Sequence, residues 1–236
     1  MPRIKRTAAE GGNGNDELSL SPLKARSKKQ DEKDKSKQRI LDSATKLFAQ
    51  KGYDGVGIRE ICKEANANIC MISYFWGGKQ ELYKGIVDNL IEKQTEYAKS
   101  FLNLDIEPST LSKQEQISLL YTVIDKVIEF LYGGLISDDL FRFLLQEQQS
   151  RSIELTSPVF VFVRKLIGAI FNKDMNDKDI IFKTVFIMSQ INSPKILPAF
   201  SLSLLRQDTF SMDDKEIIRN NAKLYVDTLI KEAEIV

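Results

Sequence analysis

The sequence contains no histidine, and its 236 residues include only two cysteines, Cys62 and Cys70. Without an imidazole, a histidine-based catalytic triad is excluded, and so is the side chain that most often acts as a general base near neutral pH. Zinc sites that need imidazole ligands are excluded as well, and two thiolates alone do not complete a tetrahedral site. We therefore predict no catalytic residues, no metal site and no cofactor, and we do not expect an enzyme.

Long apolar runs are missing too. No segment approaches the roughly 20 consecutive apolar residues that span a bilayer. Residues 1–20 have no apolar core of the kind found in a secretory signal peptide. We therefore expect no membrane partner and a cytoplasmic location, where a reducing environment keeps thiols free.

Charge is nearly balanced over the chain, at a formal net +1, but it is distributed unevenly. Residues 1–39 hold eleven Lys or Arg and six Asp or Glu, so the N-terminal end is basic and the remainder acidic. Residues 1–34 have few large apolar groups and are predicted to be a disordered basic arm. The arm is either a solvated tail or a source of salt-sensitive attraction to phosphates. In the second case the basic residues concerned are Lys24, Arg26, Lys28, Lys29 and Lys33.

From Ser36 onward, apolar residues recur at helical spacing and predict an all-α fold. A first helix should end near Gly52, and a long helix should run from Lys79 to about Leu102. Residues 158–171 are apolar nearly all round, which also suits a buried strand. Helical neighbours and the lack of a hairpin turn favour a central helix there. Further helices are expected over residues 112–133, 138–151, 177–192, 198–206 and 213–234, the last behind a capping box of Ser211 and Asp214.

Residues 57–79 predict two short helices joined by a tight turn. Asn68 suits the N-cap of the second helix, and Ile72 faces inward. The outward face of that helix then carries Ile69, Cys70, Met71, Ser73 and Tyr74. Such a face offers methyl groups, a hydroxyl and a phenol to base edges and phosphates in a DNA major groove. Short amphipathic helix pairs also occur in many all-helical proteins, so the window alone leaves both interpretations open.

The order of these segments, from ILDSATKLFAQKGYDGVGIREICKEA to NICMISYFWGGKQELY, resembles the TetR family of bacterial transcriptional regulators over residues 36–83. LLQEQQSRSIELTSPVF and ANICMISYFWGGK look like segments of its CecR-like subgroup. The resemblance implies a three-helix helix-turn-helix DNA-binding domain, here residues 35–80, and a helical effector-binding and dimerisation domain, here residues 81–236. It also implies a homodimer that binds double-stranded DNA at a near-palindromic operator and responds to a small-molecule effector.

The family's DNA contacts carry over by position. Arg59 matches a position that meets phosphate or base, and Tyr74 and Lys79 match positions that meet phosphate. Positions 68–71 and 73 match the base-reading and backbone-reading positions, and Gly78 can let the backbone approach a phosphate or simply permit a sharp turn. This sequence departs from the family at three positions: Gly57 replaces the usual Thr or Ser, Ser73 the usual Tyr or Asn, and Trp76 the usual Phe. The predicted DNA-binding set is Gly57, Arg59, Asn68, Ile69, Cys70, Met71, Ser73, Tyr74, Gly78 and Lys79.

Aromatic residues are frequent in the C-terminal part, which favours a pocket for an apolar or aromatic effector, although each ring alone also suits a core. The predicted pocket set is Tyr121, Phe130, Phe141, Phe143, Gln146, Glu147, Phe160, Arg164, Phe182 and Phe186. Dimer contacts are expected from the helices over 177–192 and 213–234, following the family arrangement.

We therefore expect a ligand-responsive repressor in which effector binding tilts the helix over 79–102 and lowers operator affinity. A constitutive DNA-binding protein without an effector remains an alternative. A helical small-molecule carrier is another, but it leaves the resemblance over residues 36–83 unexplained. A redox switch is possible for the two thiols, yet packing suits Cys62 better, and Cys70 is expected to be exposed or to face DNA.

Overall fold

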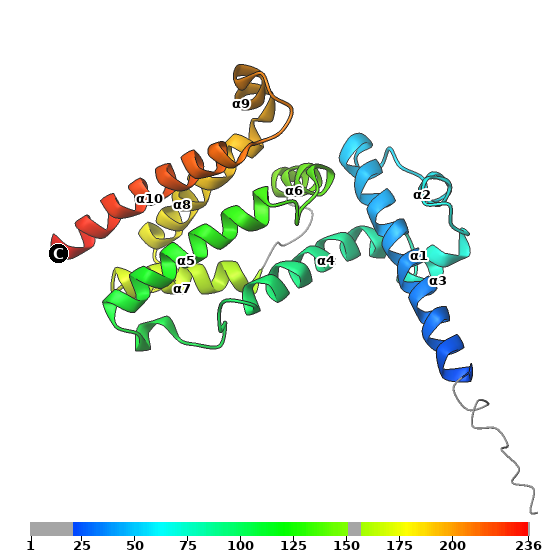
Figure 1. The fold of residues 1–236 in the computed structure, drawn as a ribbon, viewed down its shortest axis with the longest axis horizontal. Coiled ribbons are helices and arrows are strands. Elements are labelled where there is room, and N and C mark those ends of the chain that lie inside the picture. The colour runs from blue at the N-terminus through cyan, green and yellow to red at the C-terminus, as the bar shows by residue number, and fades with distance from the viewer. Residues whose placement is uncertain (1–20, 151–156, 236) are drawn as a thin grey trace, which may run out of the picture.

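The computed structural model describes residues 21–150 and 157–235, and within these ranges all regular secondary structure is helical (Figure 1). This confirms the predicted all-α class. The ten α-helices and one short 3-10 helix of the described ranges are α1 (Ser21–Lys51), α2 (Ile58–Glu64), α3 (Cys70–Trp76), α4 (Lys79–Lys99), η1 (Pro108–Thr110), α5 (Lys113–Tyr132), α6 (Asp138–Ser150), α7 (Pro158–Ile170), α8 (Lys178–Ile196), α9 (Pro198–Leu205) and α10 (Met212–Ile235). None of these helices combines the length and the apolar character needed to cross a bilayer.

The N-terminal domain consists of α1, α2, α3 and the first turns of α4. Its core joins one face of α1 to the inward sides of the two short helices that were predicted as a pair. Ile40, Phe48, Ile61, Ile72 and Leu82 are buried almost completely within it. Because each short helix alone buries very little, this shared cluster fixes their crossing.

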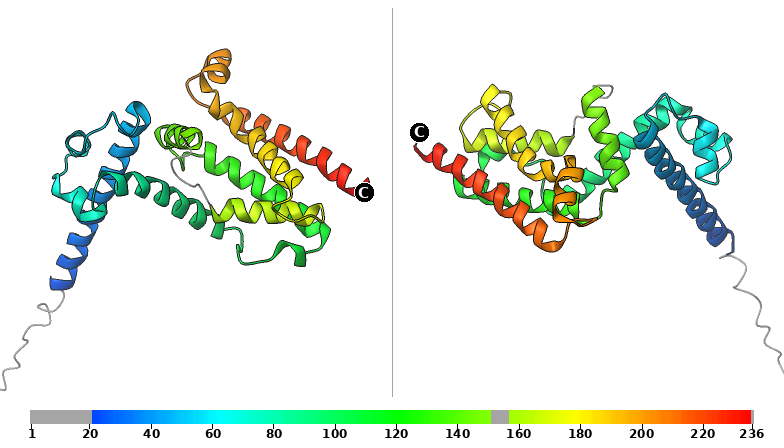
Figure 2. Two further views of the ribbon diagram at one scale, coloured as in Figure 1. Left: turned by 180° about the vertical axis from the view of Figure 1, so that it is seen from behind. Right: turned by 90° about the horizontal axis from the view of Figure 1, so that it is seen from above.

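The C-terminal domain is built from α5, α7, α8 and α10, with α9 projecting at one end (Figures 1 and 2). Its main core contains Ile124, Leu166, Ile167, Ile187 and Val226, one or two from each helix. The helix α4 runs from the N-terminal domain into this second body, where its residue Ala98 is buried. The same helix is therefore part of both domains.

The segment that also suited a buried strand is the helix α7. Ser157 caps it, accepting a hydrogen bond from the backbone N–H of Val159 at 3.2 Å, and Pro158 occupies the first turn. Val159, Val163 and Ile170 are among the many buried side chains of α7, which explains why the sequence reads as apolar nearly all round.

α1 is much longer than predicted. The expected disordered arm covered residues 1–34, but α1 begins at Ser21, and residues 1–20 lie outside the described part of the chain. Low hydropathy suggested disorder, yet after Pro22 the segment contains no Gly or Pro and is rich in Lys, Arg, Gln and Glu, which are good helix formers. Extending an existing helix costs far less than starting one, so a helix nucleated by the core at Ile40 propagates backward.

α6 lies between the two domains and contributes to both. Phe143 is fully buried in the core of the N-terminal domain. Phe141, two residues away and so on another face of the helix, packs with Leu90, Phe130 and Ile136 at the edge of the C-terminal domain. Displacing α6 would therefore disturb both packing clusters.

Candidate nucleic-acid interface and effector cavity

The short helix α3 presents most of its predicted outward face to solvent. Asn68 Oδ1 accepts a hydrogen bond from the backbone N–H of Cys70 at 2.9 Å, which satisfies one of the free donors at the start of the helix. Ile69 is 46% exposed and Tyr74 is 65% exposed, and Cys70 and Ser73 are exposed as well. Met71 is different, because it is half-buried against the core of the N-terminal domain and offers only part of its surface to a ligand.

A tight contact with α4 fixes the C-terminal end of α3. Gly77 ends α3 at a φ of 88°, a conformation that favours glycine. The indole of Trp76 then lies against Gly85, where an added Cβ would be 2.7 Å from Trp76 Nε1. Gly85 was not singled out from the sequence, although a glycine within a helical pattern is a recognisable signal of close approach.

The cations of α2 are not neutralised within the structure. Its two carboxylates pair instead with α1, Glu60 with Lys51 at 2.5 Å and Glu64 with Lys46 at 2.6 Å. The hydrogen bond from Lys51 lowers the pKa of Glu60. Arg59 forms no ion pair with the described residues, and it lines an open depression between α2 and α3 together with Asn68 and Ile69.

The remaining predicted residues lie at helix starts. Gly57 is the exposed N-cap of α2 and has extended backbone, with no side chain to cap the helix. Gly78 is the N-cap of α4, and its φ of 177° is open to any residue, so the sharp turn depends on Gly77 rather than on Gly78. Lys79 Nζ lies 4.1 Å from the centre of the Tyr53 ring, which holds this cation at the N-terminus of α4.

Two lysines of α1 that are not in the predicted DNA-binding set contact α3. Lys33 Nζ donates a hydrogen bond to Tyr74 Oη at 2.7 Å and lies 4.7 Å from the centre of that ring. Lys37 Nζ lies 5.9 Å from the ring centre of Trp76. Their spacing of four residues puts both on one face, but this signal has meaning only once the segment is known to be helical.

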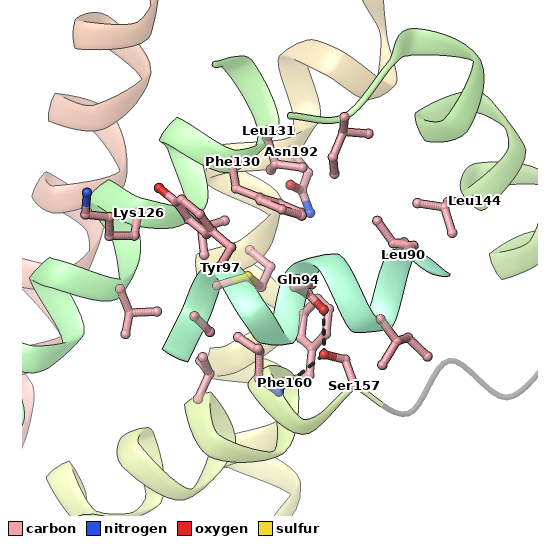
Figure 3. Close-up of a pocket in the computed structure, with 18 of the residues that line it drawn as sticks. Leu90, Gln94, Tyr97, Lys126, Phe130, Leu131, Leu144, Ser157, Phe160 and Asn192 are labelled. Carbon is pink, nitrogen blue, oxygen red and sulfur yellow. Dashed lines mark hydrogen bonds between the residues drawn. The ribbon is translucent and has the colours of Figure 1, made fainter. Parts of the chain in front are cut away.

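A cavity of about 310 Å³ lies where α4, α5, α6, α7 and α8 meet (Figure 3). Most of its lining is apolar, from residues such as Leu90, Phe130 and Leu144. Polar groups are few: Ser157 Oγ donates to Gln94 Oε1 at 2.5 Å on one side, and Asn192 Oδ1 is buried without a hydrogen-bond partner in the described structure. An apolar space with a few convergent polar groups is typical of a small-molecule site.

The ionisable groups of this cavity add little net charge. Lys126 forms an ion pair with Glu129 at 2.8 Å, which offsets its charge. Burial, with a further contribution from the Glu129 carboxylate, raises the pKa of Tyr97 to about 12, so its hydroxyl remains protonated. A mostly neutral, apolar ligand therefore fits the lining better than a strongly charged one.

Three of the ten predicted pocket residues, Phe130, Phe141 and Phe160, line this cavity. Arg164 is half-buried on α7 and does not. Tyr121 is not a lining residue either, because its hydroxyl donates to Asp227 and so joins α5 to α10. The sequence shows which side chains are aromatic, but not which neighbour each helix face meets.

The other predicted pocket residues of α6 face the N-terminal domain instead. Phe143 packs edge-to-face with Tyr83, with ring centres 4.9 Å apart. Gln146 Nε2 donates to the backbone oxygen of Ala49 at 3.0 Å, and the hydroxyl of Tyr83 donates to the buried carboxylate of Glu147. These residues therefore connect α6 to α1 and α4 and do not line this cavity.

Phe182 and Phe186 were also expected to line the pocket, and the structure places them on the surface of α8. They are 48% and 50% exposed, and their ring centres are 6.0 Å apart. Val185, also on α8, and Leu224 on α10 are exposed as well. Exposed apolar side chains of this size and number on neighbouring helices are typical of an interaction surface.

The two thiols differ as expected. Cys62 is buried and Cys70 is exposed, and they form no disulfide. Burial raises the pKa of the Cys62 thiol, and the nearby Cys70 thiol raises it further. Since the thiolate is the reactive form, Cys62 is suited to packing rather than to redox chemistry.

Comparison with known proteins agrees with this geometry. Residues 40–86 match the family model described as "Bacterial regulatory proteins, tetR family". The chain is 28% identical to the HTH-type transcriptional regulator YttP of Bacillus subtilis over 154 residues, covering 56% of this chain and 73% of YttP. It is 23% identical to the HTH-type transcriptional dual regulator CecR of Shigella flexneri over 212 residues, covering 84% of this chain and 92% of CecR, so the similarity extends well beyond the helix pair.

The fold is also shared with a transcriptional regulator from Rhodococcus sp. Rha1. That structure superposes with a TM-score of 0.52 at 14% identity and covers 85% of this chain and 98% of its own. The helix-turn-helix, the helical C-terminal domain and these relatives lead to one assignment: residues 40–86 are a DNA-binding domain of the TetR type, and the chain as a whole is similar to TetR-family bacterial transcriptional regulators, which are DNA-binding proteins and not enzymes.

Proposed function

We propose that this regulator is an effector-responsive repressor, a homodimer that binds a near-palindromic operator and leaves it when an apolar effector occupies the cavity. The observation that carries the proposal is the position of α6. One face of this helix lines the cavity through Phe141, Leu144 and Gln148. Another face enters the N-terminal domain through Phe143.

The DNA-binding surface is proposed to consist of the exposed side of α3 and the helix starts beside it. Ile69 offers methyl groups that suit thymine, while Ser73 and Tyr74 offer hydroxyls to bases or phosphates. Arg59 and Lys79 add positive charge at the starts of α2 and α4. A surface with so few hydrogen-bonding groups favours specificity that comes partly from DNA shape.

Dimerisation is proposed to use the exposed faces of α8 and α10. The apolar side chains there include Phe182, Val185, Phe186 and Leu224. A two-fold dimer places the same patch on both sides of the interface and so buries each ring against its symmetry mate or a close neighbour. It also doubles the DNA contacts of one N-terminal domain and requires two half-sites on one face of the duplex.

The effector is proposed to be a mostly neutral, apolar or aromatic molecule. The lining is apolar over most of its extent, and the unpartnered Asn192 Oδ1 is suited to accept one hydrogen bond from the ligand. A ligand in this space would press on Phe141 and Leu144 and move α6 against α1 and α4. Such coupling is typically about 1–3 kcal/mol, or roughly 5- to 150-fold in operator affinity.

Two measurements test the proposal in sequence. Purified protein is used to select duplexes from fragmented genomic DNA, and the selected site is footprinted. A panel of neutral apolar and aromatic compounds is then screened for a rise in melting temperature, and each hit is tested for release of the selected duplex.

The matched control is Ala98→Leu, which enlarges a buried side chain that lines the cavity but lies far along α4 from the DNA-binding surface. It should keep DNA binding and lose the ligand-induced shift in melting temperature. Failure to select any duplex would contradict the proposal as a whole. A selected duplex that no stabilising compound releases would instead favour a constitutive DNA-binding protein.

A further inference from the structure

α1 extends far beyond the core that it helps to build. Among the side chains described from residue 30 onward, the first buried one is Ile40, yet the helix begins at Ser21. At a rise of about 1.5 Å per residue, roughly 28 Å of helix precedes the core. Residues 30–39 are exposed or half-buried, so apolar packing does not account for this length. A helix that is polar on all sides indicates another role for the segment.

One face of this extension is uniformly basic. At about 100° per residue, positions 26, 29, 33 and 37 fall within roughly 80° of arc. The sequence places Arg26, Lys29, Lys33 and Lys37 there, and we name this set the basic stripe. The acidic residues of the same segment, at positions 31, 32 and 34, all fall outside that arc.

The basic stripe begins beside α3 and continues past it. Lys33 is hydrogen-bonded to Tyr74 and Lys37 lies over Trp76, so the C-terminal half of the stripe touches the end of α3. N-terminal to this contact, α1 continues with no other described helix beside it in any of the three views (Figures 1 and 2). The face that meets the DNA-binding domain at Ile40 thus continues as a row of cations beyond it.

We propose that the basic stripe binds phosphates of the same DNA duplex, next to the base pairs that α3 contacts. This inference rests on the proposed role of α3, because Tyr74 is both an exposed residue of α3 and the partner of Lys33. The stripe runs from residue 26 to residue 37, or about 16 Å along the helix. Double-stranded DNA presents one negative charge per roughly 1.7 Å of its axis, so several phosphates lie within that span.

The test compares two double variants of the same segment. Arg26→Gln with Lys29→Gln removes two charges from the basic stripe. The matched control, Lys24→Gln with Lys28→Gln, removes two charges from another face of the same two turns. Glutamine has a helix propensity close to that of Lys and Arg, and circular dichroism at 222 nm confirms that the helical content of both variants is unchanged.

Binding to a 40-base-pair duplex of random sequence is measured by fluorescence anisotropy between about 50 and 200 mM salt. Each lost phosphate contact reduces the slope of log K against log salt by about 0.9. The stripe variant should therefore reduce the slope by about 1.8 for each bound protomer, and the control should leave it nearly unchanged. Hydroxyl-radical footprints on a selected operator should lose flanking protection in the stripe variant alone.

Equal slopes for the two double variants, or flanking protection that persists in the stripe variant, would overturn the inference. If the slope decreases equally in the two double variants, the extension acts only through its general charge and not through the basic stripe. A wild-type protein that binds no duplex would contradict the proposed function of α3 instead. The two failures are thus distinguishable.

Discussion

Tyr83→Phe removes one hydroxyl from the junction between the two domains and tests how α6 is held there. The Tyr83 hydroxyl donates to the Glu147 carboxylate, and its ring packs against Phe143 and Phe48. The substitution keeps the ring and deletes only the donor. Glu147 is 2% exposed, so its carboxylate cannot simply take up water in place of the lost partner.

The expected cost follows from the kind of hydrogen bond that is lost. A hydrogen bond to a charged group contributes about 1.5–3 kcal/mol. For a chain of this length, each kcal/mol lowers the melting temperature by about 2–4 °C, so a decrease of about 3–12 °C is expected. Urea unfolding followed by circular dichroism gives the same free energy independently.

Tyr121→Phe is the matched control, because the Tyr121 hydroxyl also donates to a carboxylate, that of Asp227, but within the C-terminal domain. Hydrogen exchange should show faster exchange in α1 and α6 for Tyr83→Phe, and in α5 and α10 for Tyr121→Phe. An unchanged unfolding midpoint for Tyr83→Phe would refute the reasoning. So would faster exchange in the same helices for both variants.

Three further outcomes are expected. Tyr74→Ala should weaken binding to all duplexes alike. Ile69→Ala should instead change the order of affinities when single-base-pair variants of a selected operator are compared by anisotropy. An unchanged order would remove Ile69 from the base-reading set. Phe186→Asp places a charge on the exposed face of α8 and should give monomers with lower DNA affinity, and a dimer by light scattering would place the interface elsewhere. Iodoacetamide should alkylate exposed Cys70 well before Cys62, whose thiol pKa is raised by burial, and comparable rates by mass spectrometry would contradict that assignment.

Helix positions were predictable from the sequence because local signals mark their ends. The helix predicted over 112–133 is Lys113–Tyr132, and the one predicted over 213–234 is Met212–Ile235. At the start of the second helix, Ser211 Oγ accepts a hydrogen bond from the backbone N–H of Asp214, and the Asp214 carboxylate accepts one from the backbone N–H of Ser211, as the predicted capping box requires. Such caps depend on residues three positions apart, so a sequence displays them directly.

The cavity was only partly predictable, because its lining depends on contacts between distant segments. Phe141 and Phe143 are the same residue type and lie two positions apart in the sequence, yet the first lines the cavity and the second fills the N-terminal core. The period of a helix shows that two such residues face differently, but not which domain each one meets. Gln94 and Asn192 were missed for the same reason, since single amides in α4 and α8 give no local signal.

The length of α1 was missed because composition was used as evidence of disorder. Hydropathy measures how much core a segment can build, and residues 30–39 contribute no buried side chain. Its helicity has another origin, in residue propensity and in continuity with a helix that the core already stabilises. The four-residue spacing of Lys33 and Lys37 could then have been noticed as a shared face.

The burial of Phe143 in the N-terminal core limits how this regulator can be recombined with others. A hybrid protein made by joining residues 35–80 to a foreign effector domain would lack the Phe143 ring that fills this core and the buried Leu82 of α4. Loss of a buried phenylalanine costs about 3–5 kcal/mol, a large share of the stability of a small helical unit. A working hybrid should therefore carry α6, and the first turns of α4, along with the helix-turn-helix.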